Sequence, residues 1–131
     1  MTTLDEILET FSLLDDWEDR YAILIDLGKK LPDLPESLHR EEFLIKGCTS
    51  KVWMIPEVKD GRFTFQADSD AHIVKGLVAL LYITFNGKRS KEIASVDIED
   101  VFQRLGLDKN LSPNRRNGFF SMVEKIRSYG I

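Results

Sequence analysis

The chain has 131 residues, a net charge of −4 and a hydrophobic share of 43%, values typical of one folded domain. Its acidic balance disfavours a general affinity for nucleic acid or anionic membranes, and no apolar run approaches the ~20 residues that span a bilayer. A single cysteine cannot form an internal disulfide, and the acidic start "MTTLDEILET" lacks the basic and apolar parts of a secretory signal. We therefore expect a single domain over residues 1–131 in the cytoplasm.

The N-terminal part predicts two helices and a loop. The first helix has a Thr-x-x-Glu capping box at residues 3–6, followed by apolar residues at helical spacing: Leu4, Ile7, Leu8 and Phe11. The second begins near Asp15 or Asp16, with an apolar stripe formed by Trp17, Tyr21, Leu24 and Ile25. Gly28, followed by two lysines, is typical of a helix end. Residues 31–42 contain two prolines and no periodic pattern, which indicates a loop.

The middle of the chain predicts a β-hairpin. Residues 51–58, "KVWMIPEV", are rich in β-branched and aromatic residues, and "RFTFQA" at 62–67 alternates apolar and polar side chains. Asp60-Gly61 between them is a hairpin turn signal, because glycine accepts the positive φ that such turns require. Pro56 indicates an edge strand or a bulge.

The C-terminal half returns to helices. Residues 68–85, "DSDAHIVKGLVALLYITF", predict a central buried helix, capped by Asp68, Ser69 or Asp70. Shorter helices are expected over about 91–94 and 98–105, and a last one with Ser112 as its cap and Pro113 as its first residue. Helices, then a small antiparallel sheet packed against them, then further helices define the α+β class.

Charge is unevenly distributed along the chain. Residues 1–20 carry seven acidic residues against Arg20 alone, whereas the chain from Lys109 onward has five basic residues against Glu124. Such a bias is usually a solvated helix face, and the alternative is a docking surface for a charged partner.

The only cysteine, Cys48, lies in "LIKGCTSKVWM" at residues 44–54. A lone free cysteine is commonly a small buried hydrophobe. Here Gly47 and the two hydroxyl residues that follow the cysteine favour a turn, so Cys48 is predicted at the tip of a loop that joins two strands. Lys46 and Lys51 would favour its thiolate, which is the nucleophilic form.

The residues around this thiol restrict its chemistry. A thiol protease needs a histidine base, and neither His39, expected as a solvated loop residue, nor His72, expected as an exposed first-turn residue, has the context of one. One cysteine and two histidines fall short of a zinc or iron–sulfur site unless two subunits share it, and no P-loop is present. The residues therefore indicate a reactive thiol that acts together with a partner.

Four segments resemble the SufE family, the sulfur-acceptor proteins that work with cysteine desulfurases in iron–sulfur cluster assembly. They are "DWEDRYAILIDLGKKLP" at 16–32, "GCTSKVW" at 47–53, "DSDAHIVKGL" at 68–77 and "LSPNRRNGFFSMVEKIR" at 111–127. They occur in the right order over nearly the whole chain. The resemblance implies an α+β, SufE/IscU-like fold.

Residue by residue, the resemblance makes Cys48 the persulfide-forming cysteine. Other matching positions include those expected to frame the site or bind the partner: Gly47, Ser50, Trp53, Asp70 and Arg115. Trp53 is expected to pack in the strand or contact the partner, Asp70 to cap a helix or position the loop, and Arg115 to pair with an acid or dock the partner. Two departures from the family pattern are Thr49, where glutamine is frequent, and Ala67, where glycine is frequent.

The implied mechanism is sulfur transfer by an accessory protein, not an enzyme. A pyridoxal-phosphate-dependent cysteine desulfurase of the SufS type would hand its persulfide sulfur to Cys48, and a SufBCD-type scaffold complex would receive it next. The pyridoxal phosphate belongs to the desulfurase, so neither cofactor nor metal is expected in this chain, which would be a monomer or homodimer. The alternatives are a CsdE-like acceptor serving another desulfurase, an interaction module with an incidental thiol, and, more remotely, a cysteine hydrolase.

Overall fold

The computed structural model describes residues 3–47 and 50–129. Its α-helices there are α1 (Leu4–Ser12), α2 (Trp17–Lys29), α3 (His72–Phe85), α4 (Ser90–Ser95), α5 (Ile98–Arg104), α6 (Leu107–Asn110) and α7 (Pro113–Tyr129). Two 3₁₀ turns, η1 (Glu36–Leu38) and η2 (Glu41–Phe43), lie in the segment that connects α2 to the strands. The strands are β1 (Val52–Lys59), β2 (Arg62–Ser69) and β3 (Lys88–Arg89).

The three strands form one antiparallel sheet in the order β1-β2-β3. Asp60 and Gly61 join β1 to β2 with φ angles of 54° and 76°, as the hairpin signal predicted. Pro56 lies in β1, which is an edge strand, so its missing N–H removes no bond from the centre of the sheet. The α+β class predicted from the sequence is confirmed.

Three predicted helix starts are confirmed, and one is wrong. Thr3 accepts a hydrogen bond from the Glu6 N–H at 3.2 Å, Asp16 accepts one from Glu18 at 2.9 Å, and Ser112 accepts one from Arg115 at 3.3 Å. The central helix α3 instead has Ala71 at its N-cap position and no side-chain cap. The three polar residues expected to cap α3 use their side chains mainly on other segments. The short helix α6 had no sequence signal.

The helix α2 ends at Lys29, directly after Gly28, as the Gly-Lys-Lys sequence predicted, but Gly28 also has a second role. A Cβ placed on Gly28 would lie 2.9 Å from the backbone nitrogen of Gly76 in α3. A Cβ on Gly76 would collide with the carbonyl group of Leu24 in α2. The two glycines therefore allow the backbones of α2 and α3 to touch.

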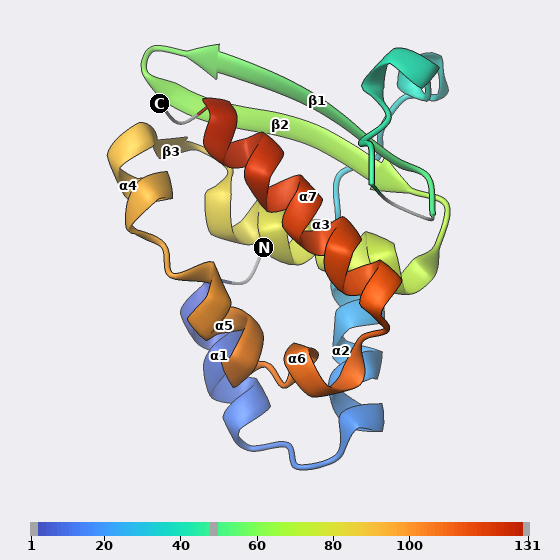
Figure 1. Cartoon of the computed structure of the whole chain (residues 1–131), viewed down its shortest axis with the longest axis vertical. Coiled ribbons are helices and arrows are strands. Elements are labelled where there is room, and N and C mark those ends of the chain that lie inside the picture. Colours follow the sequence, from blue (N-terminus) through green and yellow to red (C-terminus); the bar gives the residue numbers. More distant parts are fainter. Residues whose placement is uncertain (1–2, 48–49, 130–131) are drawn as a thin grey trace.

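The sheet, α3 and α7 enclose the core (Figure 1). On one face of β2, Phe63 stacks on Tyr129 of α7 at 5.8 Å between ring centroids, and Phe65 meets Tyr82 of α3 at 5.4 Å. The helix α7 crosses in front of α3, while α1, α2, α5 and α6 form the opposite end of the molecule. No helix in the described part of the chain is long and apolar enough to cross a membrane.

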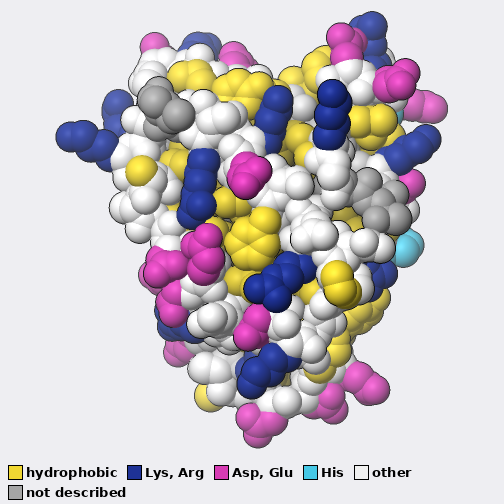
Figure 2. All heavy atoms as spheres, viewed as in Figure 1, with side chains coloured by type: hydrophobic (Ala, Val, Ile, Leu, Met, Phe, Trp, Pro, Cys, Tyr) yellow, Lys and Arg dark blue, Asp and Glu magenta, His cyan; other side chains and the backbone are white. Residues whose placement is uncertain are grey.

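The acidic N-terminal residues and the basic C-terminal residues of the sequence lie at different places on the folded molecule. Figure 2 shows acidic side chains at the narrow end of the molecule, near the turn between α1 and α2, and basic side chains across the face occupied by α7. Exposed members of the two groups are Asp15, Asp16, Glu18 and Asp19 at the turn, and Arg115, Arg116 and Lys125 on α7. The acidic residues and the basic residues thus lie on different parts of the surface.

Candidate functional site

The two ends of the predicted cysteine loop lie next to each other. Leu44 forms an isolated antiparallel bridge with Trp53, and the Ile45 N–H donates to the Val52 carbonyl at 2.8 Å. Gly47 has φ +90°, and a Cβ there would lie 2.7 Å from the Ser121 hydroxyl of α7. The loop therefore leaves a short strand-like pairing and passes against α7.

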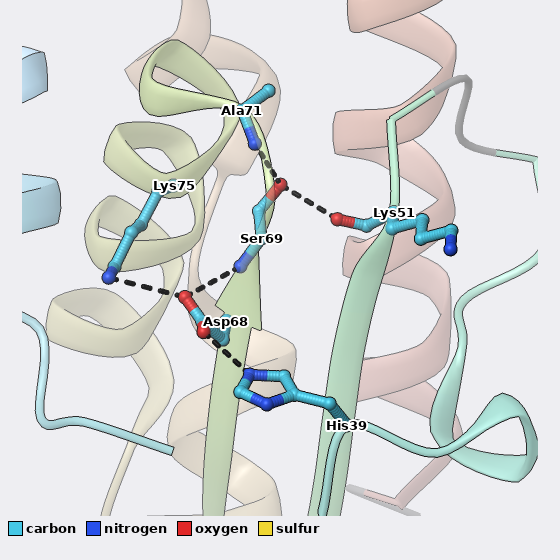
Figure 3. Close-up of polar contacts among 6 residues, drawn as sticks. All are labelled: His39, Lys51, Asp68, Ser69, Ala71 and Lys75. Carbon is cyan, nitrogen blue, oxygen red and sulfur yellow. Dashed lines mark hydrogen bonds and ion pairs between the residues drawn. The ribbon is translucent and has the colours of Figure 1, made fainter. Parts of the chain in front are cut away.

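The downstream end of the loop is bonded to the corner between β2 and α3. The Lys51 N–H donates to the Asp70 carboxylate at 3.0 Å, and the Asp70 N–H donates to the Lys51 carbonyl at 3.2 Å. The Ser69 hydroxyl also donates to that carbonyl at 2.8 Å and accepts from the Ala71 N–H at 3.3 Å (Figure 3). Three hydrogen bonds therefore fix the backbone of Lys51, while its side chain points away from the cluster.

The carboxylate of Asp68 accepts hydrogen bonds or ion pairs from three groups. Its carboxylate lies 2.8 Å from Nε2 of His39, 3.2 Å from Nζ of Lys75 in α3, and 2.8 Å from the N–H of Ser69 (Figure 3). Only 18% of its side chain is exposed. Burial alone would raise the pKa of Asp68, but the hydrogen bonds, first that from His39, outweigh burial and lower this pKa. Asp68 is thus an ionised junction between the connecting segment, the hairpin and α3.

Trp53 and His39 pack together on the outer face of the hairpin. Trp53 is paired with Asp68 across the two strands, and its ring meets that of His39 edge-on at 4.5 Å between centroids. Trp53 is half-buried, in agreement with the packing role expected for it. His39 was expected to be a solvated loop residue, but its side chain is 24% exposed and bonded to Asp68. That expectation is wrong.

A small apolar recess brings Ser50 and Arg115 together. Its volume is about 20 Å³, room for roughly one water molecule. It lies between the loop, α3 and the start of α7, and its lining consists of Ser50, Val74, Leu77, Asn114, Arg115, Gly118, Phe119 and Met122. Within the described residues Arg115 forms no ion pair, so its guanidinium at this rim is open to a partner.

The structure places five of the six predicted site residues. Gly47 and Ser50 flank the predicted nucleophile, and Arg115 lies at the recess. Asp70 belongs to the hydrogen-bonded corner, whereas Trp53 lies in β1 and packs against His39. Cys48 itself and Thr49 lie outside the described residues. No role had been assigned to His39, because a histidine in a proline-containing loop carries no spacing that points to an aspartate 29 residues later.

We also searched the described side chains for a possible metal site. No group of three or more His, Cys, Asp or Glu residues at positions 3–47 and 50–129 is placed to hold a metal ion. The carboxylate of Asp68, which such a site could use, is already occupied by its three donors.

We expect Asp68→Asn to lower the free energy of unfolding by about 1–3 kcal/mol at pH 7, because the variant loses charge-assisted hydrogen bonds that are shielded from water. The folded pKa of Asp68 is lowered, so this stabilisation is complete above the unfolded pKa of about 3.9 and is lost as pH falls through the folded value. Urea unfolding at pH 7, 5 and 3 should therefore show the difference from wild type closing in acid.

Asp26→Asn is the matched control, because Asp26 pairs with Lys30 at 3.7 Å while both side chains are about two-thirds exposed. Its effect should stay within about 0.5 kcal/mol. A loss of stability in Asp68→Asn that is equally large at pH 3 and pH 7 would contradict the ionised junction.

The comparisons with known proteins identify the family of this chain. The SufE family model, described as an Fe-S metabolism associated domain, matches residues 5–130. An uncharacterized SufE-like protein of Rhizobium meliloti is 46% identical over 132 residues, covering 98% of this chain and 94% of the relative. One of Rhizobium etli is 46% identical over 131 residues, covering 97% and 88%.

A solved structure supports the fold alone. The solution structure of a hypothetical protein from Thermus thermophilus superposes with a TM-score of 0.76 at 21% identity, covering 97% of this chain and 92% of the other. The family model and both Rhizobium relatives cover nearly the whole chain. The chain belongs to the SufE family.

Proposed function

We propose that this protein is a sulfur carrier that accepts a persulfide on Cys48 from a pyridoxal-phosphate-dependent cysteine desulfurase of the SufS type. Family membership supports a sulfur-acceptor role in iron–sulfur metabolism and, with it, interaction with a cysteine desulfurase. The family also suggests an accessory protein of sulfur transfer. The pyridoxal phosphate is the desulfurase's own, and the carrier stimulates that enzyme by removing its sulfur.

The observation that carries the proposal is the bonded frame around the cysteine position. Residues on both sides of it are held, upstream by the Leu44–Trp53 bridge and downstream by the bonds of Lys51 to Ser69 and Asp70. A nucleophile presented by a short loop with fixed ends needs little further ordering when a partner docks. Arg115, exposed beside Ser50 at the recess, is available for an acidic group of the desulfurase.

The transfer step needs no external oxidant or reductant. The Cys48 thiolate attacks the outer sulfur of the persulfide on the desulfurase cysteine, forming a new S–S bond while the old S–S bond breaks. The desulfurase cysteine leaves as a thiolate, so one electron pair moves and the outer sulfur keeps its oxidation state. The exposed side chains of Lys46 and Lys51 raise the local positive potential, which favours a thiolate at this loop. A SufBCD-type scaffold complex then takes the sulfur.

We expect the protein to gain the mass of one sulfur atom after incubation with a SufS-type desulfurase and L-cysteine, and we expect Cys48→Ser to gain none. Because the chain has a single cysteine, a thiol-bound sulfur can only be on Cys48. Intact-protein mass spectrometry before and after treatment with a reducing thiol gives the measurement. Addition that survives Cys48→Ser, or wild-type protein that gains no sulfur, would refute the proposal.

A further inference from the structure

His39 occupies a place that the proposed transfer step does not use. It lies between η1 and η2, nine residues before the cysteine, yet it is bonded to the hairpin behind the loop. Nε2 of His39 lies 2.8 Å from Oδ2 of Asp68, and its ring packs edge-on against Trp53 (Figure 3). The segment that leads into the loop is therefore fastened to β1 and β2 at one point.

His39 contacts Trp53 and Asp68, the residue pair that holds the upstream end of the Cys48 loop. Trp53 and Asp68 face each other across β1 and β2, and the backbone of Trp53 forms the bridge with Leu44. With His39 in place, the chain from 39 to 44 closes over the outer face of the hairpin, and Ile45 can bond to Val52. The downstream end has its own bonds from Lys51 to Ser69 and Asp70 and does not depend on His39.

We propose that His39 is a positioning residue for sulfur transfer: its bond to Asp68 and its contact with Trp53 hold the upstream end of the Cys48 loop in the arrangement that a desulfurase docks. This inference rests on the proposed function and deepens it. Only carrier molecules whose loop has this arrangement bind the desulfurase productively. If a substitution lowers the fraction of molecules in this arrangement, the apparent dissociation constant for the desulfurase rises by the same factor.

The charged groups around His39 are already paired with each other. Asp68 of β2 faces it directly, and Lys75 of α3 shares that carboxylate from the other side at 3.2 Å. On its own segment, Arg40 and Glu42 pair with each other at 2.8 Å. Nε2 of His39 can donate a hydrogen bond to the Asp68 carboxylate at 2.8 Å, so the positions of the two side chains define this contact.

Three variants test the inference. His39→Leu removes the donor, His39→Gln keeps a donor nitrogen at about the same reach without a titrating group, and His72→Gln changes the other histidine, an exposed residue in the first turn of α3. Circular dichroism at the assay temperature establishes the folded fraction of each carrier, and concentrations are corrected for it. The partner is a SufS-type desulfurase with L-cysteine.

Backbone amide exchange in the free carrier is the readout that needs no activity. We expect the Ile45 amide of His39→Leu to exchange about tenfold faster than in wild type, and the Lys51 amide to change less than about twofold, because its acceptor Asp70 is untouched. Equal acceleration at both amides would indicate general loosening, and no acceleration at Ile45 would overturn the inference.

The kinetic readout is the carrier concentration that gives half-maximal stimulation of the desulfurase. His39→Leu should raise it about fivefold while the maximal rate stays within about twofold, and His39→Gln should recover most of the difference. His72→Gln should follow wild type throughout.

The outcomes separate this inference from the proposed function. If wild-type carrier gains no sulfur, the proposed function fails, whatever the amides do. If it gains sulfur but His39→Leu has an unchanged half-saturating concentration, or loses only maximal rate, then His39 has no positioning role.

Discussion

Gly76→Ala is expected to lower the free energy of unfolding by roughly 3 kcal/mol or more, near the upper end of what overpacking costs. The added methyl group would collide with the carbonyl of Leu24, and a backbone group cannot rotate away as a side chain can. Alanine has a better helix propensity than glycine by about 1 kcal/mol, which offsets only part of the cost. Urea unfolding followed by circular dichroism measures the difference.

Gly87→Ala is a useful contrast, because nothing lies within 4 Å of a Cβ placed there. Its φ of +78° is unfavourable for alanine, so the expected cost is about 1 kcal/mol from backbone strain alone. If Gly76→Ala were no more destabilising than Gly87→Ala, close contact between α2 and α3 would not be what Gly76 provides.

Arg20→Met should cost about 2–4 kcal/mol of unfolding free energy. The guanidinium donates to three carbonyls at helix ends, those of Phe11 at 2.9 Å, Leu14 at 2.9 Å and Leu105 at 3.0 Å. It also lies 5.5 Å from the centre of the Phe11 ring. Methionine keeps much of the apolar stem but donates nothing, so three partly buried acceptors lose a charged partner.

Two further variants make the Arg20 prediction specific. Arg20→Lys should recover less than half of the loss, because one ammonium group cannot reach three carbonyls arranged for a planar guanidinium. Arg104→Met removes an exposed arginine that lies 3.8 Å from Asp100, and it should cost no more than about 0.5 kcal/mol. Equal losses for Arg20→Met and Arg104→Met in the same denaturant titration would contradict the role given to Arg20.

The sequence predicted those elements that depend on interactions between residues close together in the chain. The turn at Asp60-Gly61, the caps at Thr3, Asp16 and Ser112, and the buried stripe of α3 all depend on residues close together in the chain, so the sequence could show them. The helix end at Gly28 was predictable, but its contact with α3 was not, because a glycine at a helix end and a glycine at a helix crossing have the same local appearance. Only the position of α3 distinguishes them.

The sequence predicted which residues belong to the candidate site, but not which of them contact each other. The small residues and lysines around Cys48 indicate a loop, and the family resemblance names Gly47, Ser50, Asp70 and Arg115. That Asp68 joins His39 to Lys75, and that Ser69 and Asp70 bind Lys51 instead of capping α3, follows from the pairing of β1 with β2. The two-residue turn fixes which residues of β1 and β2 face each other, but no spacing in the sequence places His39 against them.

The hairpin register places a limit on how this domain can vary. The turn at Asp60 and Gly61 lies at the end of β1 and β2 opposite the pairing of Trp53 with Asp68 (Figure 1). A residue inserted at this tip would have to be accommodated there, as a bulge or a longer turn. A one-residue shift of one strand along the other would instead exchange inward and outward side chains and separate Trp53 from Asp68. A change in the length of this turn is therefore expected to alter the tip and its contact with β3, while the alignment of the two strands beyond it stays constant.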